Sequence, residues 1–278
     1  MELVTSKDGT PIAVDRYGSG PALILIDGAM CARAFGPLPP LAKALASHFT
    51  VYHYDRRGRG ESGDAAAWDQ QREIEDLDAV ITLAGGSAMV FGISSGAALA
   101  AEAARQLRGI TRLALYEAPY VVDDTHAPLP PTFIAELQAL VATNRRSEAV
   151  KKFMRYVGTP AIAVFVMSKL PFWKNFTSIA HTLPYDLQII APHHNSRPFP
   201  AGKWSAITIP TLVMAGGKSP AYMQNAMRAL ADALPNAAHQ TLAGQTHMVK
   251  TPALAPALQS FFTLASATPA AKELALQR

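Results

Sequence analysis

The sequence predicts an α/β fold built on a doubly wound, mostly parallel sheet. Short apolar runs rich in Val, Ile and Leu are bounded by Gly, Pro or Asp, as is typical of strands buried on both faces of a parallel sheet. Amphipathic helical patterns alternate with these runs. That alternation favours helices on both faces, with ligands bound beyond the carboxyl ends of the strands. The 278 residues, of which 49% are hydrophobic, are enough for one large core.

The elements follow one another in a regular order over most of the chain. Apolar runs predict strands at residues 22–26, 49–54, 88–91, 110–116 and 211–215, and a further strand is expected at 239–242, before the glycine that opens the next loop. Helical periodicity predicts helices at 72–83, 97–107, 222–234 and 252–264. Between Pro119 and about Trp204 no clear buried strand appears. The patterns there predict helices at 131–143, 147–157, 161–169 and 171–182.

The stretch Gly92-Ile93-Ser94-Ser95-Gly96 lies between a predicted strand and a predicted alanine-rich helix. Such a turn is so tight that its central serine takes up a strained backbone conformation, and the flanking glycines avoid collisions between Cβ atoms. The strain places the Ser94 hydroxyl above the sheet. The Ser95 N–H, at a helix N-terminus, faces developing negative charge. This context favours a nucleophile over the alternative, a glycine-rich turn without chemistry.

In this context the chain resembles the α/β-hydrolase family over nearly its whole length. The landmarks appear in family order: Asp27-Gly28-Ala29 after the first run, residues 55–62 after the second, the serine turn, and Gly244-Gln245-Thr246-His247 near the end. The resemblance implies an α/β-hydrolase core formed by residues 1–118 and 205–266. Residues 119–204 are expected to form a helical cap inserted after the sixth strand, and residues 267–278 a charged, alanine-rich tail that frays.

The resemblance also implies roles in acyl transfer. Ser94 is the expected nucleophile, and His247, on the loop after the last strand, is the base that takes its proton. The oxyanion hole is expected from the backbone N–H groups of Ser95 and Ala29, with Met30 as the neighbouring candidate for the second donor. The cap is expected to close an apolar pocket above the serine, for which the candidate lining residues are Met30, Trp173 and Tyr185.

The acid that orients His247 is the point at which the chain departs from the family. Ser219 occupies the position where an aspartate is usual; its hydroxyl could accept a hydrogen bond from the imidazole but not stabilise its positive charge. Glu117 matches the position of the acid in haloalkane dehalogenases, at the end of the sixth strand, and is the predicted acid. The alternatives are a hinge role for Glu117, an acid from the cap (Asp186 or Asp123), and a serine–histidine dyad.

A second departure is Asp27, which stands where family members usually have histidine. A buried carboxylate needs partners of its own, and Arg57 and Ser62 are the expected ones. The arginine-rich stretch 56–60 is interpreted as a structural turn, with Asp55 and Ser62 bonding locally, rather than as a phosphate or nucleic-acid site.

Composition argues against several other classes of protein. The formal net charge of +4 without basic runs interleaved with aromatics does not indicate nucleic acid, and no apolar stretch is long enough to span a bilayer. A single cysteine, Cys31, which is expected to be a small buried side chain, and an N-terminus without the apolar region of a signal peptide favour the cytoplasm. His193-His194 lacks further ligands at metal spacing and Gly85-Gly86 lacks a dinucleotide register, so no metal or organic cofactor is expected.

These expectations predict a serine hydrolase that cleaves a carboxylic ester, or a related acyl bond, of a small apolar substrate through an acyl-enzyme. A serine nucleophile argues against dehalogenation, which needs a carboxylate in its place. Two alternatives stay open. One is a cofactor-free haloperoxidase, perhydrolase or oxygenase, because some relatives use the same residues for such chemistry; the other is a non-catalytic ligand-binding homologue. A homo-oligomer is compatible with either.

Overall fold

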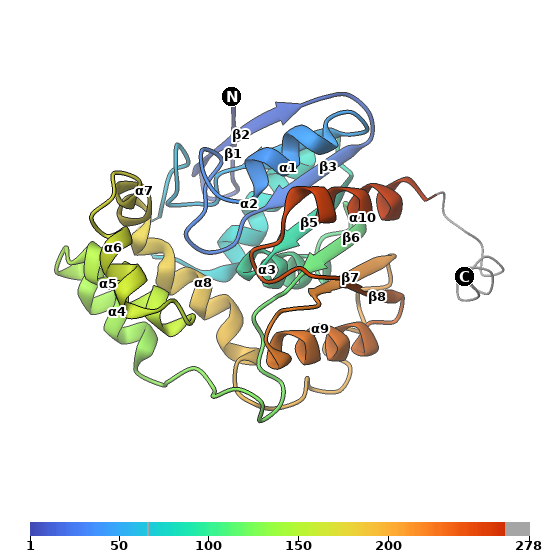
Figure 1. The fold of residues 1–278 in the computed structure, drawn as a ribbon. Coiled ribbons are helices and arrows are strands. Elements are labelled where there is room, and N and C mark those ends of the chain that lie inside the picture. The colour runs from blue at the N-terminus through green and yellow to red at the C-terminus, as the bar shows by residue number, and fades with distance from the viewer. Residues whose placement is uncertain (66, 265–278) are drawn as a thin grey trace.

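A mixed, mostly parallel sheet forms the centre of the computed structural model, which describes residues 1–65 and 67–264 (Figure 1). Its strands in these residues are β1 (Glu2–Thr5), β2 (Pro11–Tyr17), β3 (Ala22–Ile26), β4 (Thr50–Tyr54), β5 (Ala88–Ile93), β6 (Ile110–Tyr116), β7 (Thr211–Gly216) and β8 (Ala237–Leu242). They lie in the order β1-β2-β4-β3-β5-β6-β7-β8. The β1–β2 and β2–β4 pairs are antiparallel and all the other pairs are parallel, which confirms the predicted fold class.

The parallel strands are buried because they consist of apolar runs. Every residue of β4, β5 and β7 is buried, and β3 is buried at all but its first position. β8 instead mixes half-buried and exposed positions, as expected of a strand at the edge of the sheet. Sequence reasoning missed the β1–β2 hairpin, whose signal is the Asp8-Gly9 dipeptide between the two strands.

Helices cover both faces of the sheet (Figure 1). α2 (Gln70–Leu83), α3 (Ser95–Ala104) and α9 (Ala221–Ala233) belong to the apolar cluster on one face, while α1 (Leu38–Leu45) and α10 (Thr251–Thr263) belong to the cluster on the other. α3 is rich in alanine and buried at every position, so this helix packs closely against the strands that carry the site. The prediction missed α1, where prolines lie in the first turn, a position that tolerates them.

The chain between β6 and β7 forms a helical insertion. It contains α4 (Phe133–Ala142), α5 (Arg146–Tyr156), α6 (Ala161–Met167), α7 (Trp173–Ser178) and α8 (Leu183–Ile190), with short 3-10 turns at Ala180–Thr182 and Ala191–His193. In Figure 1, α4 to α7 lie to one side of the sheet, and α8 leads from them back to the core, where it packs against α3. The insertion after the sixth strand is therefore confirmed, although α8 was not among the predicted helices.

Two predictions from the sequence concern where the core, the helical insertion and the C-terminal tail begin and end. The division of the chain at residues 118 and 204 stays a prediction, and the tail at residues 267–278 lies outside the described residues. Among the helices of the described ranges, none is both long and apolar enough to cross a membrane.

Candidate active site

Ser94 lies in a sharp turn between β5 and α3. Its backbone has φ 58° and ψ −130°, a conformation that non-glycine residues rarely adopt. The neighbouring glycines make the turn possible. A Cβ on Gly92 would lie 2.4 Å from the carbonyl oxygen of Gly96, and a Cβ on Gly96 would lie 2.4 Å from that of Ile26. The strand and helix can therefore approach closely, and Ser94 is left half-buried at the end of the strand.

His247 and Glu117 lie in line with the serine hydroxyl. Nε2 of His247 is 3.2 Å from Ser94 Oγ, and Nδ1 of the same ring is 2.8 Å from Glu117 Oε2. The other carboxylate oxygen, Oε1, accepts a hydrogen bond from the Gly216 N–H at 2.7 Å. Glu117 is fully buried whereas the His247 side chain is 32% exposed. The carboxylate is thus shielded from water while the imidazole is open to a substrate.

The carboxyl ends of three parallel strands bring these three residues together. Ser94 follows β5, Glu117 follows β6, and His247 lies on the loop after β8, at the same edge of the sheet. The Tyr116 hydroxyl donates a hydrogen bond to the Thr246 carbonyl oxygen at 2.7 Å, which ties the histidine loop to β6. The sheet topology therefore fixes the distances within the group.

Backbone strain is concentrated at this site. Five non-glycine residues of the described chain have positive φ, and three of them are Met30, Ser94 and Glu117. Such a conformation costs on the order of 1–3 kcal/mol and persists only where the surrounding structure holds it. Strain beside a reactive group is typical of functional sites. The loop after β3, the serine turn and the acid are therefore best treated as one site.

The loop after β3 approaches the serine most closely at Gly28. A Cβ at this position would lie 2.7 Å from Ser94 Cβ and 3.3 Å from its Oγ. The peptide that joins Gly28 to Ala29 therefore lies beside the nucleophile. Ser95, the residue after the serine, is the first residue of α3, and the first N–H groups of a helix have no partner within it. Both residues predicted to supply the oxyanion hole therefore lie close to Ser94.

Replacing Gly28 by alanine is expected to destabilise the fold by about 1–3 kcal/mol, because the new methyl group has no room against Ser94 and the carbonyl oxygen of Ile93. Urea unfolding measures this change. Gly217→Ala is the matched control, since a Cβ there would meet its nearest neighbour, Thr241 Cγ2, at an ordinary 3.4 Å. Equal unfolding midpoints for the two variants would contradict the close approach of the loop to the serine.

The other residues considered for the role of the acid do not contact the histidine. Asp186 lies in a buried cluster with two arginines, and Asp123 binds the side chains of a threonine and an asparagine. The Ser219 hydroxyl is buried and has no hydrogen-bond partner in the described part of the chain, so it does not accept a bond from the His247 ring. Among these candidates, within the described residues, Glu117 is the carboxylate that contacts the imidazole.

Asp27 pairs with a residue that the sequence did not suggest. Its Oδ2 lies 2.6 Å from Nε2 of His53 on the neighbouring strand β4, and both side chains are buried. The expected partners were wrong. The Arg57 guanidinium forms two hydrogen bonds with Asp76, and the Ser62 hydroxyl donates to a main-chain carbonyl oxygen in its own turn. The parallel pairing of β3 with β4 creates the actual contact, which spacing along the chain does not indicate.

Of the three candidate pocket residues, Met30 lies on the loop beside the serine. The contacts of the other two lie within the insertion and at its edge. Trp173 Nε1 donates to Ser147 Oγ at 2.9 Å, and the Tyr185 ring stacks on Trp68 with 5.1 Å between centroids. Neither contact involves the serine or the histidine, and a pocket role for these two residues stays a prediction.

Burial shifts the pKa of three other reactive side chains, Cys31, His193 and His194. Burial and, secondarily, the charge of Asp27 raise the pKa of the Cys31 thiol well above its usual value, so the thiol stays protonated near neutral pH. Burial lowers the pKa of both His193 and His194. His194 Nδ1 lies 2.7 Å from the Pro119 carbonyl oxygen. Within the described residues, no group of three or more His, Cys, Asp and Glu side chains could hold a metal ion.

Sequence reasoning missed the Gly216 contact with the acid and the contact of Asp186, an alternative acid, with Ser95. Gly216 holds the Glu117 carboxylate through its N–H, and its signal was the Gly-Gly dipeptide that ends the predicted strand. Asp186 accepts a hydrogen bond from the Ser95 hydroxyl at 2.7 Å. No local pattern indicates this contact, because 91 residues separate the two and α8 was not predicted.

Comparison with known proteins shows which family the chain resembles. A model of the alpha/beta hydrolase family matches residues 12–258. The structure of an alpha/beta hydrolase from Sphaerobacter thermophilus has 49% sequence identity and a TM-score of 0.86, and the match covers 94% of this chain and 100% of that one.

More distant structures share the fold. A thermophilic esterase from Thermogutta terrifontis has 20% identity, a TM-score of 0.66 and coverage of 94% and 97% of the two chains. A bromoperoxidase from Bacillus anthracis has 19% identity, a TM-score of 0.69 and coverage of 95% and 99%. No curated protein sequence matches the chain. Since the family model spans most of the sequence, the chain belongs to the alpha/beta hydrolase family.

Proposed function

We propose that this protein is a serine hydrolase that cleaves a carboxylic ester, or a related acyl bond, of a small apolar substrate through an acyl-enzyme. The observation that carries the proposal is the continuous line of contacts from the Ser94 hydroxyl through both ring nitrogens of His247 to the buried Glu117 carboxylate. A serine hydroxyl becomes a nucleophile when a positioned base takes its proton, and this line supplies the base and the group that orients it.

The proposed reaction has two halves. In the first, Ser94 Oγ attacks the acyl carbon while His247 Nε2 takes its proton, and the imidazolium then protonates the leaving group. The Ala29 and Ser95 N–H groups stabilise the negative charge of the tetrahedral intermediate. In the second, His247 activates a water molecule that releases the acyl group from Ser94. Glu117 accepts the Nδ1 proton in a hydrogen bond throughout and stabilises the imidazolium by its charge.

The same contacts argue against a serine–histidine pair that lacks an acid and against a protein that only binds its ligand. A displaced or missing acid would have suited a serine–histidine pair that only abstracts protons, but Glu117 lies 2.8 Å from the ring and is itself held by Gly216. A pure binding protein has no need of a strained serine beside an aligned base and acid, each of which costs stability. The esterase with which the chain shares its fold supports ester chemistry only at the level of fold.

Treatment with a fluorophosphonate probe is expected to add one covalent group to the peptide that carries Ser94, because the probe reacts with a serine only where a base and an oxyanion hole activate it. Mass spectrometry of the intact protein and of its peptides measures the adduct. Ser94→Ala is expected to remain unlabelled, and unfolded wild-type protein serves as the second control. A folded wild-type protein that takes up no label would contradict the proposed function.

A further inference from the structure

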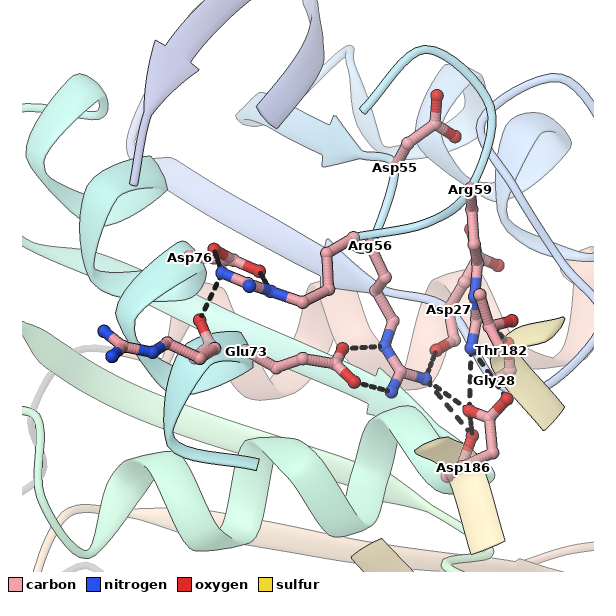
Figure 2. Close-up of polar contacts among 12 residues, drawn as sticks. Asp27, Gly28, Asp55, Arg56, Arg59, Glu73, Asp76, Thr182 and Asp186 are labelled. Carbon is pink, nitrogen blue, oxygen red and sulfur yellow. Dashed lines mark hydrogen bonds and ion pairs between the residues drawn. The ribbon is translucent and has the colours of Figure 1, made fainter. Parts of the chain in front are cut away.

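A cluster of four charged side chains lies directly beneath the candidate site. Arg56 and Arg59 come from the turn after β4, Glu73 from α2, and Asp186 from α8 of the insertion (Figure 2). Each side chain is at most 2% exposed. The two positive and two negative charges balance, and every one of the four is paired, as burial of charges requires. We call these residues the buried charge cluster.

Asp186 is the member that joins the insertion to the serine turn. Its Oδ1 accepts a hydrogen bond from the Ser95 hydroxyl at 2.7 Å and from Arg56 Nη1 at 2.6 Å, and both of its oxygens accept from Arg59 Nη2. Burial alone would raise the pKa of this carboxyl, but the charges of Arg59 and Arg56 outweigh it and hold the pKa below its usual value. Asp186 is therefore ionised near neutral pH and fixes the first residue of α3.

Arg59 links Asp186 to the loop after β3. While Nη2 binds Asp186, Nη1 donates to the carbonyl oxygen of Gly28 at 2.6 Å (Figure 2). Nη1 also donates to the carbonyl oxygen of Cys31 at 3.2 Å. The guanidinium thus holds both ends of the Gly28–Cys31 loop. Arg56 Nη1 adds a longer contact to the Asp27 carbonyl oxygen at 3.3 Å, and the Arg56 side chain is fixed in turn by two hydrogen bonds that it donates to the Glu73 carboxylate.

The bond to Gly28 has a consequence for the neighbouring N–H group. The Gly28 carbonyl and the Ala29 N–H belong to one planar trans peptide, in which the two groups point in opposite directions. Because the carbonyl is held toward the buried Arg59, the Ala29 N–H is held away from it. A rotation of this peptide would leave the arginine without its acceptor and turn the N–H toward the cluster.

From these contacts we infer that Arg59 and Asp186 are positioning residues for the oxyanion hole, and that docking of α8 on the core sets both of its donors. One carboxylate of the insertion fixes Ser95 directly, and it fixes the Gly28–Ala29 peptide through Arg59. This inference rests on the proposed function, since an oxyanion hole matters only to an enzyme that forms a tetrahedral intermediate. It assigns to the insertion a part in catalysis that is separate from covering a substrate.

The test compares Arg59→Gln with Arg57→Gln. Both arginines are fully buried on the same turn, but Arg57 binds Asp76 and Asp8 and has no contact with the loop among its hydrogen bonds in the described residues. Hydrolysis of p-nitrophenyl acetate gives kcat and KM. Inhibition by a trifluoromethyl ketone, compared with the matched methyl ketone, reports stabilisation of an oxyanion alone.

Arg59→Gln is expected to lower kcat about 10- to 100-fold, and the affinity of the trifluoromethyl ketone by a similar factor, because one donor no longer faces the oxyanion. KM and the affinity of the methyl ketone are expected to change little, since both depend on binding of the ground state. Arg57→Gln is expected to lower the urea midpoint but to keep kcat. Asp186→Asn, which keeps the size of the side chain, provides the same comparison if Arg59→Gln does not fold.

The arms of this experiment separate its two possible failures. If wild-type protein neither hydrolyses the ester nor reacts with the fluorophosphonate probe, the proposed function is wrong and the inference falls with it. If wild-type protein is active and Arg59→Gln or Asp186→Asn keeps its kcat, the inference alone is wrong. Equal losses of kcat in the Arg59 and Arg57 variants would also overturn it, because they would show a general structural role for the turn.

Discussion

Replacing Glu117 by glutamine is expected to lower kcat about 10³- to 10⁴-fold. Glutamine keeps the size of the side chain and can still accept the hydrogen bond from the Gly216 N–H, but it has no charge with which to stabilise the His247 imidazolium. Because the loss arises only when the histidine becomes charged, it is expected in kcat rather than in KM. Steady-state hydrolysis of a p-nitrophenyl ester near neutral pH measures both quantities.

Asp123→Asn is the matched control for this experiment. Asp123 also follows β6, and it was an alternative acid, but its carboxylate binds Thr125 and Asn225. The substitution is therefore expected to leave kcat unchanged. Near-normal turnover of Glu117→Gln, or a large loss in Asp123→Asn, would mean that the buried glutamate is a hinge residue and that the acid lies elsewhere.

The sequence predicted the parts of the fold that local patterns determine. Apolar runs of four to seven residues located the buried parallel strands, and the glycines around Ser94 located the strained turn. Two of the missed elements, α1 and α8, lack such signals. The first turn of α1 contains prolines, and α8 follows a 3-10 turn that interrupts its helical pattern. Both form because they pack against helices that are distant in the sequence, α10 for α1 and α3 for α8.

The site shows the same division between local and distant interactions. Ser94 and His247 were recognisable because each lies at a fixed place relative to its own strand. The sequence could propose Glu117 but could not choose between the ends of β6 and β7, since the two strands are adjacent and both end beside the histidine loop. The contact of Asp27 with His53 and the buried charge cluster were out of reach, because they depend on side chains brought together by strand pairing and by docking of the insertion.

Position 219, where the family usually has an aspartate, is a second place from which a carboxylate could serve His247. Ser219 lies one turn after β7, its N–H donates to the Gly216 carbonyl oxygen at 3.0 Å, and its hydroxyl lies against Gly216 without a hydrogen-bond partner in the described residues. The Gly216 N–H in turn holds Glu117. A carboxylate at position 219 would therefore enter the space beside the present acid, on the strand from which most family members supply theirs.

In the Glu117→Gln background, Ser219→Asp is expected to recover at least about 100-fold of the lost kcat, because it returns a negative charge to the side of His247 that faces Nδ1. Ser219→Asn in the same background is the control, since it adds the same bulk to a buried position without the charge. Urea unfolding of both double variants measures the cost of that bulk, which is expected to be about equal in the two. If aspartate restores no more activity than asparagine, the loop after β7 has lost the path to the imidazole as well as the acid. Of these two positions, Glu117 would then be the one from which a carboxylate can serve His247.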